Sequence, residues 1–171
     1  DGHPDRAAAE RLFRSLAAKG LTAAFAESCT GGLCAAALTS IAGSSGVFLG
    51  GVVSYSNAAK RDLLGVSAAT LERAGAVSRE AVAEMAAGAR SRFGADCALS
   101  VSGIAGPGGA TPGKPVGTVW FGASGPGFAL ERLFRFDGDR EAVRTAARDA
   151  ALGLLSDALD GAGPAVGEDQ A

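Results

Sequence analysis

The segment "LTAAFAESCTGGLCAAALTSIAG", residues 21–43, decides the class of fold. Its first eight residues are an apolar run typical of a short buried strand, and residues 31–43 have the small side chains of a closely packed helix. The glycines between the two parts favour a tight turn. Strand, turn and helix in this order are the repeating unit of sheets with parallel strands, so the segment predicts an α/β fold.

The rest of the chain continues the alternation of strand and helix. Apolar or alternating runs predict further strands at 47–55, 97–103, 116–124 and 128–136. The Gly-Pro-Gly sequence between the last two predicts a hairpin. Helices are expected around these strands, three of them with the N-cap residues Ser67, Ser78 and Asp139. We therefore expect a three-layer α/β/α domain with a mixed, mostly parallel sheet.

The composition sets the size of this domain and the class of its partners. With 171 residues, 47% of them hydrophobic, the chain suffices for one domain, which we expect at residues 5–160 between disordered tails at 1–4 and 161–171. A formal charge of -2 with scattered basic residues gives no electrostatic support for direct binding to nucleic acid. No apolar stretch reaches the roughly 18 residues of a membrane span, and we expect no signal peptide. We expect a cytoplasmic protein without membrane contact that binds a small molecule.

The histidine and cysteine content narrows the chemistry. The single histidine, His3, lies in an N-terminal segment that we expect to be frayed. Without a core histidine the fold can hold neither a Ser-His-Asp triad nor a His-based zinc site. The three cysteines, Cys29, Cys34 and Cys97, lack zinc-type spacing, and we expect them to be reduced and apolar in role. Acid–base chemistry is therefore expected to use a carboxylate, a tyrosine or a lysine of lowered pKa.

Three polar turns follow strands whose carboxyl ends are expected at one edge of the sheet: 28–32, 55–60 and 102–110. Open α/β sheets bind their ligands at this edge. In the first turn, the run Thr30, Gly31, Gly32 precedes a helix and can offer N–H groups to an anion. Ser28 is then either a nucleophile or a wall of that anion site.

The other two turns supply complementary groups. In the third, Ser102 ends a strand, and Gly103 and Gly106 can expose N–H groups to a carboxylate, a phosphate or an oxyanion. In the second, Lys60 can act as a general base only if its surroundings lower its pKa from about 10.4 toward 7 or 8. Tyr55, the only tyrosine, lies five residues before it.

Arg140 follows the sequence Asp-Gly-Asp at the start of the last expected helix. It either pairs there with Asp137 or Asp139, or it clamps a phosphate or carboxylate of a ligand. The two interpretations differ in where its guanidinium points.

These motifs together resemble one family. The segments "AESCTGG", "AGSSGVFLGGVVSYSNAAK", "GAVSREAVAEMAAGA", "SVSGIAGPGG", "KPVGTVWFG" and "GDREAVR" follow the order and spacing of the CinA C-terminal domain, also known as the nicotinamide-nucleotide amidohydrolase family. The resemblance covers roughly residues 8–160 and indicates a stand-alone form of the domain.

The resemblance implies hydrolysis of the carboxamide of nicotinamide mononucleotide (NMN) to nicotinate mononucleotide and ammonia, without a metal or cofactor. It implies a serine-lysine arrangement assisted by tyrosine, with Ser45, Lys60 and Tyr55 at the matching positions. Ser28, Ser102 and Arg140 lie in further family motifs. The Ala-rich domain with its Gly-rich strand is also expected to form a homo-oligomer. The alternative function is a non-catalytic module for nucleotide sensing, competence or DNA damage.

Chain geometry and the resemblance favour different nucleophiles. An extended strand from 47 to 55 spans roughly 30 Å and places Ser45 and Tyr55 at opposite ends. A right-handed crossover would instead place Ser28 at the same edge as Tyr55 and Lys60. Ser45 can join them only if residues 44–49 form a helical turn, if the strand bends at its two central glycines, or if a second subunit supplies it.

Overall fold

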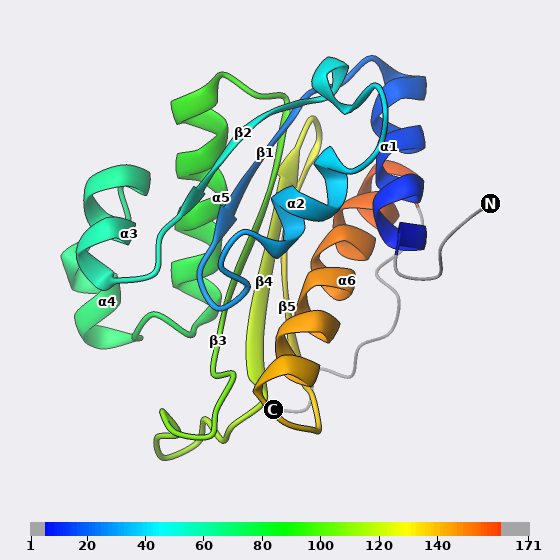
Figure 1. Ribbon diagram of the computed structural model, residues 1–171. Coiled ribbons are helices and arrows are strands. Elements are labelled where there is room, and N and C mark those ends of the chain that lie inside the picture. The colour runs from blue at the N-terminus through cyan, green and yellow to red at the C-terminus, as the bar shows by residue number, and fades with distance from the viewer. Residues whose placement is uncertain (1–5, 162–171) are drawn as a thin grey trace.

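The computed structural model describes residues 6–161, and a five-stranded sheet organises them (Figure 1). The strands are β1 (Ala23–Glu27), β2 (Phe48–Val53), β3 (Cys97–Gly103), β4 (Thr118–Gly125) and β5 (Phe128–Arg135). Their order across the sheet is β2-β1-β3-β4-β5. β1 pairs in parallel with β2 and β3, whereas β4 pairs antiparallel with β3 and β5. The mixed sheet and its terminal hairpin are confirmed.

Helices cover both faces of the sheet, which confirms the three-layer architecture (Figure 1). They are α1 (Ala7–Lys19), α2 (Leu33–Thr39), α3 (Asn57–Leu64), α4 (Ala68–Arg73), α5 (Arg79–Phe93) and α6 (Arg140–Leu159). Alternate residues of β1 serve the two faces. Phe25 packs in the core with α1, α2 and α6, whereas Ala24 and Ala26 pack in the core with α5. Within residues 6–161, no helix combines the length and the apolar character needed to cross a bilayer.

Side-chain caps fix where the helices begin. The predicted N-caps Ser67, Ser78 and Asp139 are confirmed, because each accepts a hydrogen bond from the backbone N–H three residues further on. Ser56 caps α3 in the same way through Ala59. The predicted tails lie outside the described residues, apart from Gly161, which belongs to a turn.

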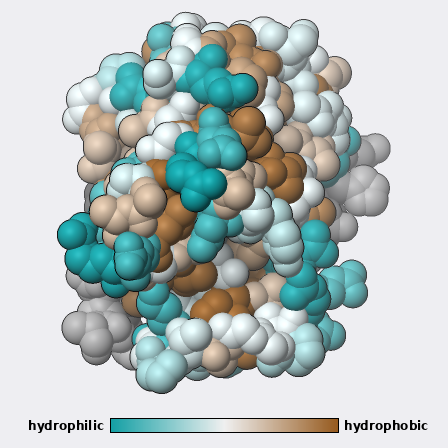
Figure 2. All heavy atoms as spheres, turned by 90° about the vertical axis from the view of Figure 1, so that its left-hand side faces the viewer, coloured by the Kyte–Doolittle hydropathy of each residue, from teal (hydrophilic) through white to brown (hydrophobic). Residues whose placement is uncertain are grey.

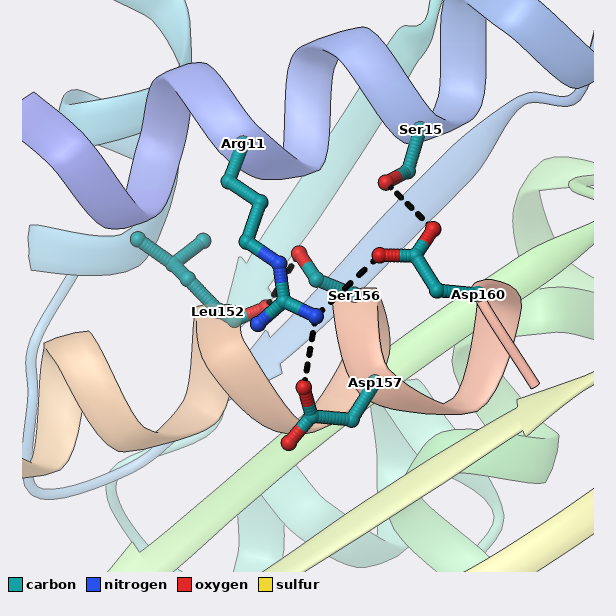
Figure 3. A network of polar contacts seen from close by, with 6 residues as sticks. All are labelled: Arg11, Ser15, Leu152, Ser156, Asp157 and Asp160. Carbon is teal, nitrogen blue, oxygen red and sulfur yellow. Dashed lines mark hydrogen bonds and ion pairs between the residues drawn. The ribbon is translucent and has the colours of Figure 1, made fainter. Parts of the chain in front are cut away.

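A polar network fastens α1 to the C-terminal end of α6 (Figure 3). The Arg11 guanidinium pairs with Asp157 at 2.6 Å and with Asp160 at 3.1 Å. The Ser15 hydroxyl donates to the other oxygen of Asp160 at 2.8 Å, and this bond together with Arg11 lowers the pKa of that carboxyl. Since α6 has 20 residues, or about 30 Å at 1.5 Å per residue, this network is remote from Arg140 at the helix start.

Gly88 in α5 lets α3 approach closely, and we expect Gly88→Ala to lower the free energy of unfolding. A Cβ at this position would collide with the carbonyl group of Leu64 at the end of α3. Overpacking costs about 1–3 kcal/mol, and a collision with backbone atoms, which cannot rotate away as a side chain can, places the cost at the upper end, above the gain of about 1 kcal/mol in helix propensity. Urea unfolding would measure the difference. Gly153→Ala in α6 is the matched control, because an added Cβ there meets no atom within 4 Å, and it should be neutral or stabilising.

Candidate active site

The parallel pairing of β1 with β2 brings two of the polar turns together. Glu27 lies opposite Val53 at the carboxyl ends of these strands, so Ser28 and Ser54 follow side by side. The Ser54 N–H donates to the Glu27 carbonyl at 2.8 Å, and the Ser28 N–H donates to the Val101 carbonyl of β3 at 3.0 Å. The last residue of β1 and the first residue of the turn are therefore bonded to the chain on both sides, one to Ser54 after β2 and the other to β3.

Lys60 reaches this junction from α3. Its side chain is buried, with 1% of the residue surface exposed. The Nζ atom lies 3.0 Å from Ser28 Oγ, 2.8 Å from the Ser54 carbonyl and 3.1 Å from the Tyr55 carbonyl. Ser56 caps α3, so Lys60 lies in the first turn of the helix and its side chain bonds the carbonyls of the preceding loop.

The three contacts of Lys60 suit a base as well as an acid. Burial lowers the pKa of the Lys60 amine from its ordinary value of 10.5. A neutral amine has two N–H groups and one lone pair. As an ammonium, Lys60 donates to Ser28 Oγ and to the Ser54 and Tyr55 carbonyls. As a neutral amine that donates its two N–H groups to those carbonyls, it can accept from the Ser28 hydroxyl with its lone pair. Lys60 can therefore take the Ser28 proton.

Cys29 lies next to Ser28, but its thiol is not activated as a nucleophile. Burial raises the pKa of Cys29 to about 11, so the thiol is protonated at neutral pH. Cys34 and Cys97 are likewise free and buried. The expectation that the cysteines are reduced and apolar in role agrees with this environment.

A pocket opens over Ser28 and Lys60. Six predicted site residues line it: Ser28, Tyr55, Lys60, Ser102, Gly103 and Arg140. Five further lining residues were not predicted: Cys29, Asn57, Ala76, Val77 and Ala105. Ala76 and Val77 come from the connection between α4 and α5, and their small apolar side chains carry no chemical signal in the sequence. Between residues 6 and 161, no group of three His, Cys, Asp or Glu side chains is placed to hold a metal ion.

Arg140 and Tyr55 close one side of the pocket. The Arg140 guanidinium donates to the Gly106 carbonyl at 2.8 Å and to the Tyr55 hydroxyl at 3.2 Å. These contacts differ from the pairing with Asp137 or Asp139, which was one of the two interpretations of Arg140, and Asp139 instead caps α6 by accepting from the Ala142 N–H. Tyr55 is 62% exposed, so its hydroxyl and the Arg140 guanidinium face solvent at the rim.

The run Thr30, Gly31, Gly32 lies beside the pocket but outside its lining. The two glycines have φ angles of 58° and 105°, a backbone region that side chains with a Cβ rarely adopt. The Gly31 N–H donates to the Ser28 carbonyl, and the buried Thr30 hydroxyl donates to Glu27. The turn is bonded internally, and anion binding by its N–H groups stays a prediction.

The structure places Ser45 at the far end of β2. Residues Ser44–Gly46 form a 3-10 turn, and Ser45 is exposed. β2 then runs from Phe48, opposite Ala23 at the start of β1, over six residues. A strand of this length spans about 20 Å, so within one chain Ser45 does not reach Lys60. Of the helical turn considered for residues 44–49, only Ser44–Gly46 is found, because β2 already begins at Phe48, and it does not bring Ser45 to the pocket.

Known proteins share this fold and much of this sequence. The family model of the CinA C-terminal domain matches residues 5–159. The nicotinamide-nucleotide amidohydrolase PncC of Enterobacter agglomerans is 60% identical over 131 residues, which cover 76% of this chain and 80% of that protein. A CinA-like protein of Mycolicibacterium vanbaalenii is 54% identical over 84% of this chain, which spans 34% of that longer protein.

Solved structures agree with the sequence comparisons. A CinA superfamily protein from Klebsiella pneumoniae superposes with a TM-score of 0.89 at 41% identity, covering 93% of this chain and 99% of that one. The competence/damage-inducible protein of Agrobacterium tumefaciens gives a TM-score of 0.88 at 45% identity, covering 93% and 97%. The chain belongs to the CinA C-terminal domain family.

Proposed function

We propose that this protein hydrolyses the carboxamide of NMN to nicotinate mononucleotide and ammonia, with Ser28 as nucleophile and Lys60 as general base. One observation carries the proposal: a buried lysine of lowered pKa touches a serine hydroxyl on the floor of a pocket. The relative named nicotinamide-nucleotide amidohydrolase supports the choice of substrate. An amide needs an activated oxygen nucleophile, and no histidine is present between residues 6 and 161 to activate one.

In the first half of the reaction, Lys60 takes the proton of the Ser28 hydroxyl as Oγ attacks the carboxamide carbon. The tetrahedral intermediate then loses its nitrogen. The Lys60 ammonium gives its proton to that nitrogen, the C–N bond breaks, and ammonia departs. An ester between Ser28 and the nicotinoyl group is left.

In the second half of the reaction, water takes the place of Ser28 as the nucleophile, and Ser28 becomes the leaving group. Lys60 takes a proton from a water molecule, whose oxygen attacks the ester carbon. The bond between the carbon and Ser28 Oγ breaks, and Ser28 recovers its proton from Lys60. Nicotinate mononucleotide is released and the starting state is restored.

We assign the remaining polar groups of the pocket to substrate binding. Ser102 and Gly103 lie on the β3 side of the lining, where their polar groups can hold the carboxamide oxygen. Arg140 at the rim is suited to the substrate phosphate, because its guanidinium is exposed and already directed over the pocket. Tyr55, whose hydroxyl accepts a hydrogen bond from Arg140, would bind beside the phosphate, and its assistance to the serine-lysine pair stays a prediction.

We further propose that a second copy of the chain pairs along β2, and that Ser45 of the partner subunit contributes to the pocket near Tyr55. β2 is an edge strand without charged residues, and an edge of this kind is open to pairing. Leu49 and Val53 in β2 and Leu63 in α3 are exposed. Figure 2 views the molecule from the side of α3 and α4 and shows hydrophobic groups at the surface between hydrophilic ones. Antiparallel pairing centred on Gly50 and Gly51 would bring Ser45 of the partner subunit toward Tyr55.

The proposal is tested by incubating purified protein with NMN and measuring ammonia and nicotinate mononucleotide. Stoichiometric release of both products is the expected result. Saturable binding of NMN by calorimetry with no product from pH 6 to 10 would instead favour the alternative, a nucleotide-sensing module without catalysis.

The rate should rise with pH because Lys60 must be neutral to act as a base. Burial lowers the Lys60 pKa, so we expect kcat/KM for NMN to rise through that value and level off below pH 10.5. Between the lowered pKa and 10.5, the unfolded chain binds one more proton at Lys60 than the folded chain does. This difference makes folding more favourable as pH rises through that window. A pH–rate profile measures the midpoint, and a rate that falls as pH increases across the window would contradict the role of Lys60.

A further inference from the structure

A buried carboxylate holds the inner side of the Ser28 turn. Glu27 ends β1 with 2% of its surface exposed, and its side chain points to the start of α2. One oxygen accepts from the Thr30 hydroxyl at 2.6 Å and from the Cys34 N–H at 2.9 Å, and the other accepts from the Ala35 N–H at 3.1 Å. Glu27 therefore occupies the place at this helix end where an external anion would bind.

An arginine holds the outer side of the same turn. Arg144 lies one helical turn after Arg140 on α6. Its Nε donates to the Cys29 carbonyl at 3.0 Å, and one of its terminal nitrogens donates to the Thr30 carbonyl at 3.4 Å. An added Cβ at Gly31 would lie 3.4 Å from this guanidinium, so the turn and Arg144 are in close contact. The fork of the guanidinium is suited to adjacent carbonyls in a way that a lysine is not.

We propose that Glu27 and Arg144 are positioning residues. They hold residues 28–32 from two sides and so keep Ser28 Oγ within hydrogen-bond distance of Lys60 Nζ. This inference rests on the proposed function. Neither residue lines the pocket. Both act through the backbone of the turn: Glu27 fixes Thr30 and the first N–H groups of α2, and Arg144 fixes the carbonyls just after Ser28. Since Glu27 already satisfies the start of α2, the substrate phosphate is left to Arg140.

The test compares Arg144→Ala with the wild-type protein. The half-buried side chain leaves a gap open to solvent, so the fold should persist. We expect kcat for NMN to fall about 10²-fold, the scale of a small misplacement of a reacting group, whereas the Kd for NMN measured by calorimetry stays the same. Added guanidinium ion should restore part of kcat in a saturable way, and Arg144→Lys should restore less than the native arginine provides. Glu27→Gln should likewise have a lower kcat than the wild-type protein and the same Kd for NMN.

Arg11→Ala is the matched control, because it removes a guanidinium that also ties α6 to another element, at the opposite end of the helix. It should leave kcat unchanged. Amide hydrogen exchange in residues 28–35 gives a readout independent of activity and should accelerate in Arg144→Ala but not in Arg11→Ala. If the wild-type protein did not turn over NMN, the proposed function would be refuted. The exchange data would still show whether Arg144 holds residues 28–35 in place. The positioning role would be overturned if hydrogen exchange and kcat were unchanged in Arg144→Ala. It would also be overturned if only substrate binding weakened, with higher Kd and KM but the same kcat.

Discussion

Replacing Lys60 with methionine is expected to lower kcat/KM for NMN by about 10²- to 10⁴-fold, the range that general bases contribute. Methionine fills a similar buried volume but cannot take the Ser28 proton. Two effects on stability oppose each other. The folded state no longer buries an amine, but the carbonyls of Ser54 and Tyr55 lose a donor. We therefore expect Tm to stay close to that of the wild type, which thermal unfolding would check.

Lys19→Met provides the control for this substitution. Lys19 is an exposed residue in the last turn of α1, so its loss should change neither kcat/KM nor the pH profile. If Lys60→Met kept most of the wild-type rate while folding normally, Lys60 would not be the base.

Replacing Ser28 with alanine is the second change of large effect. We expect a loss of at least about 10³-fold in kcat, because no nucleophile is left beside Lys60. The variant should still bind NMN, since it loses only one hydroxyl from the pocket. Rates with saturating NMN, together with calorimetry, separate the two effects. A Ser28→Ala protein with a near-normal rate would exclude Ser28 as the nucleophile.

Ser45→Ala tests the proposed contribution from the partner subunit. We expect this variant to be impaired, and mixing it with Lys60→Met should recover activity after the subunits exchange. A Ser45→Ala protein that keeps most of the wild-type rate would show instead that each site is complete within one chain. An impaired Ser45→Ala protein that mixing does not rescue would contradict a contribution across the interface.

The sequence predicted the part of the site that depends on strand direction. An apolar strand before "SCTGG" and another before "SNAAK", joined by a crossover, are expected to run parallel, so Ser28 and Lys60 could be placed at one edge of the sheet without knowledge of side-chain contacts. The N-caps could be predicted as well, because capping is a local interaction between a side chain and the backbone three residues on.

Contacts between distant segments and the backbone could not be predicted in this way. Arg144 bonds carbonyl groups more than a hundred residues away, and a backbone carbonyl leaves no mark in the sequence. For Arg140 the sequence left two interpretations open, pairing with Asp137 or Asp139 and binding of a ligand anion, and it gave no sign of the contacts with the Gly106 carbonyl and the Tyr55 hydroxyl. Glu27 did leave a signal, a single charged residue at the end of the otherwise apolar run "AAFAE", and a buried carboxylate there requires donors nearby.

The most direct test of the account is to locate the covalent intermediate. Wild-type protein is mixed with NMN, quenched in acid, digested and mapped by mass spectrometry. We predict an ester between Ser28 and the nicotinoyl group of the nucleotide, with the ribose phosphate still attached to the ring, that appears with ammonia release and is missing in Lys60→Met. An ester on Ser45, or on any residue other than Ser28, would contradict the account.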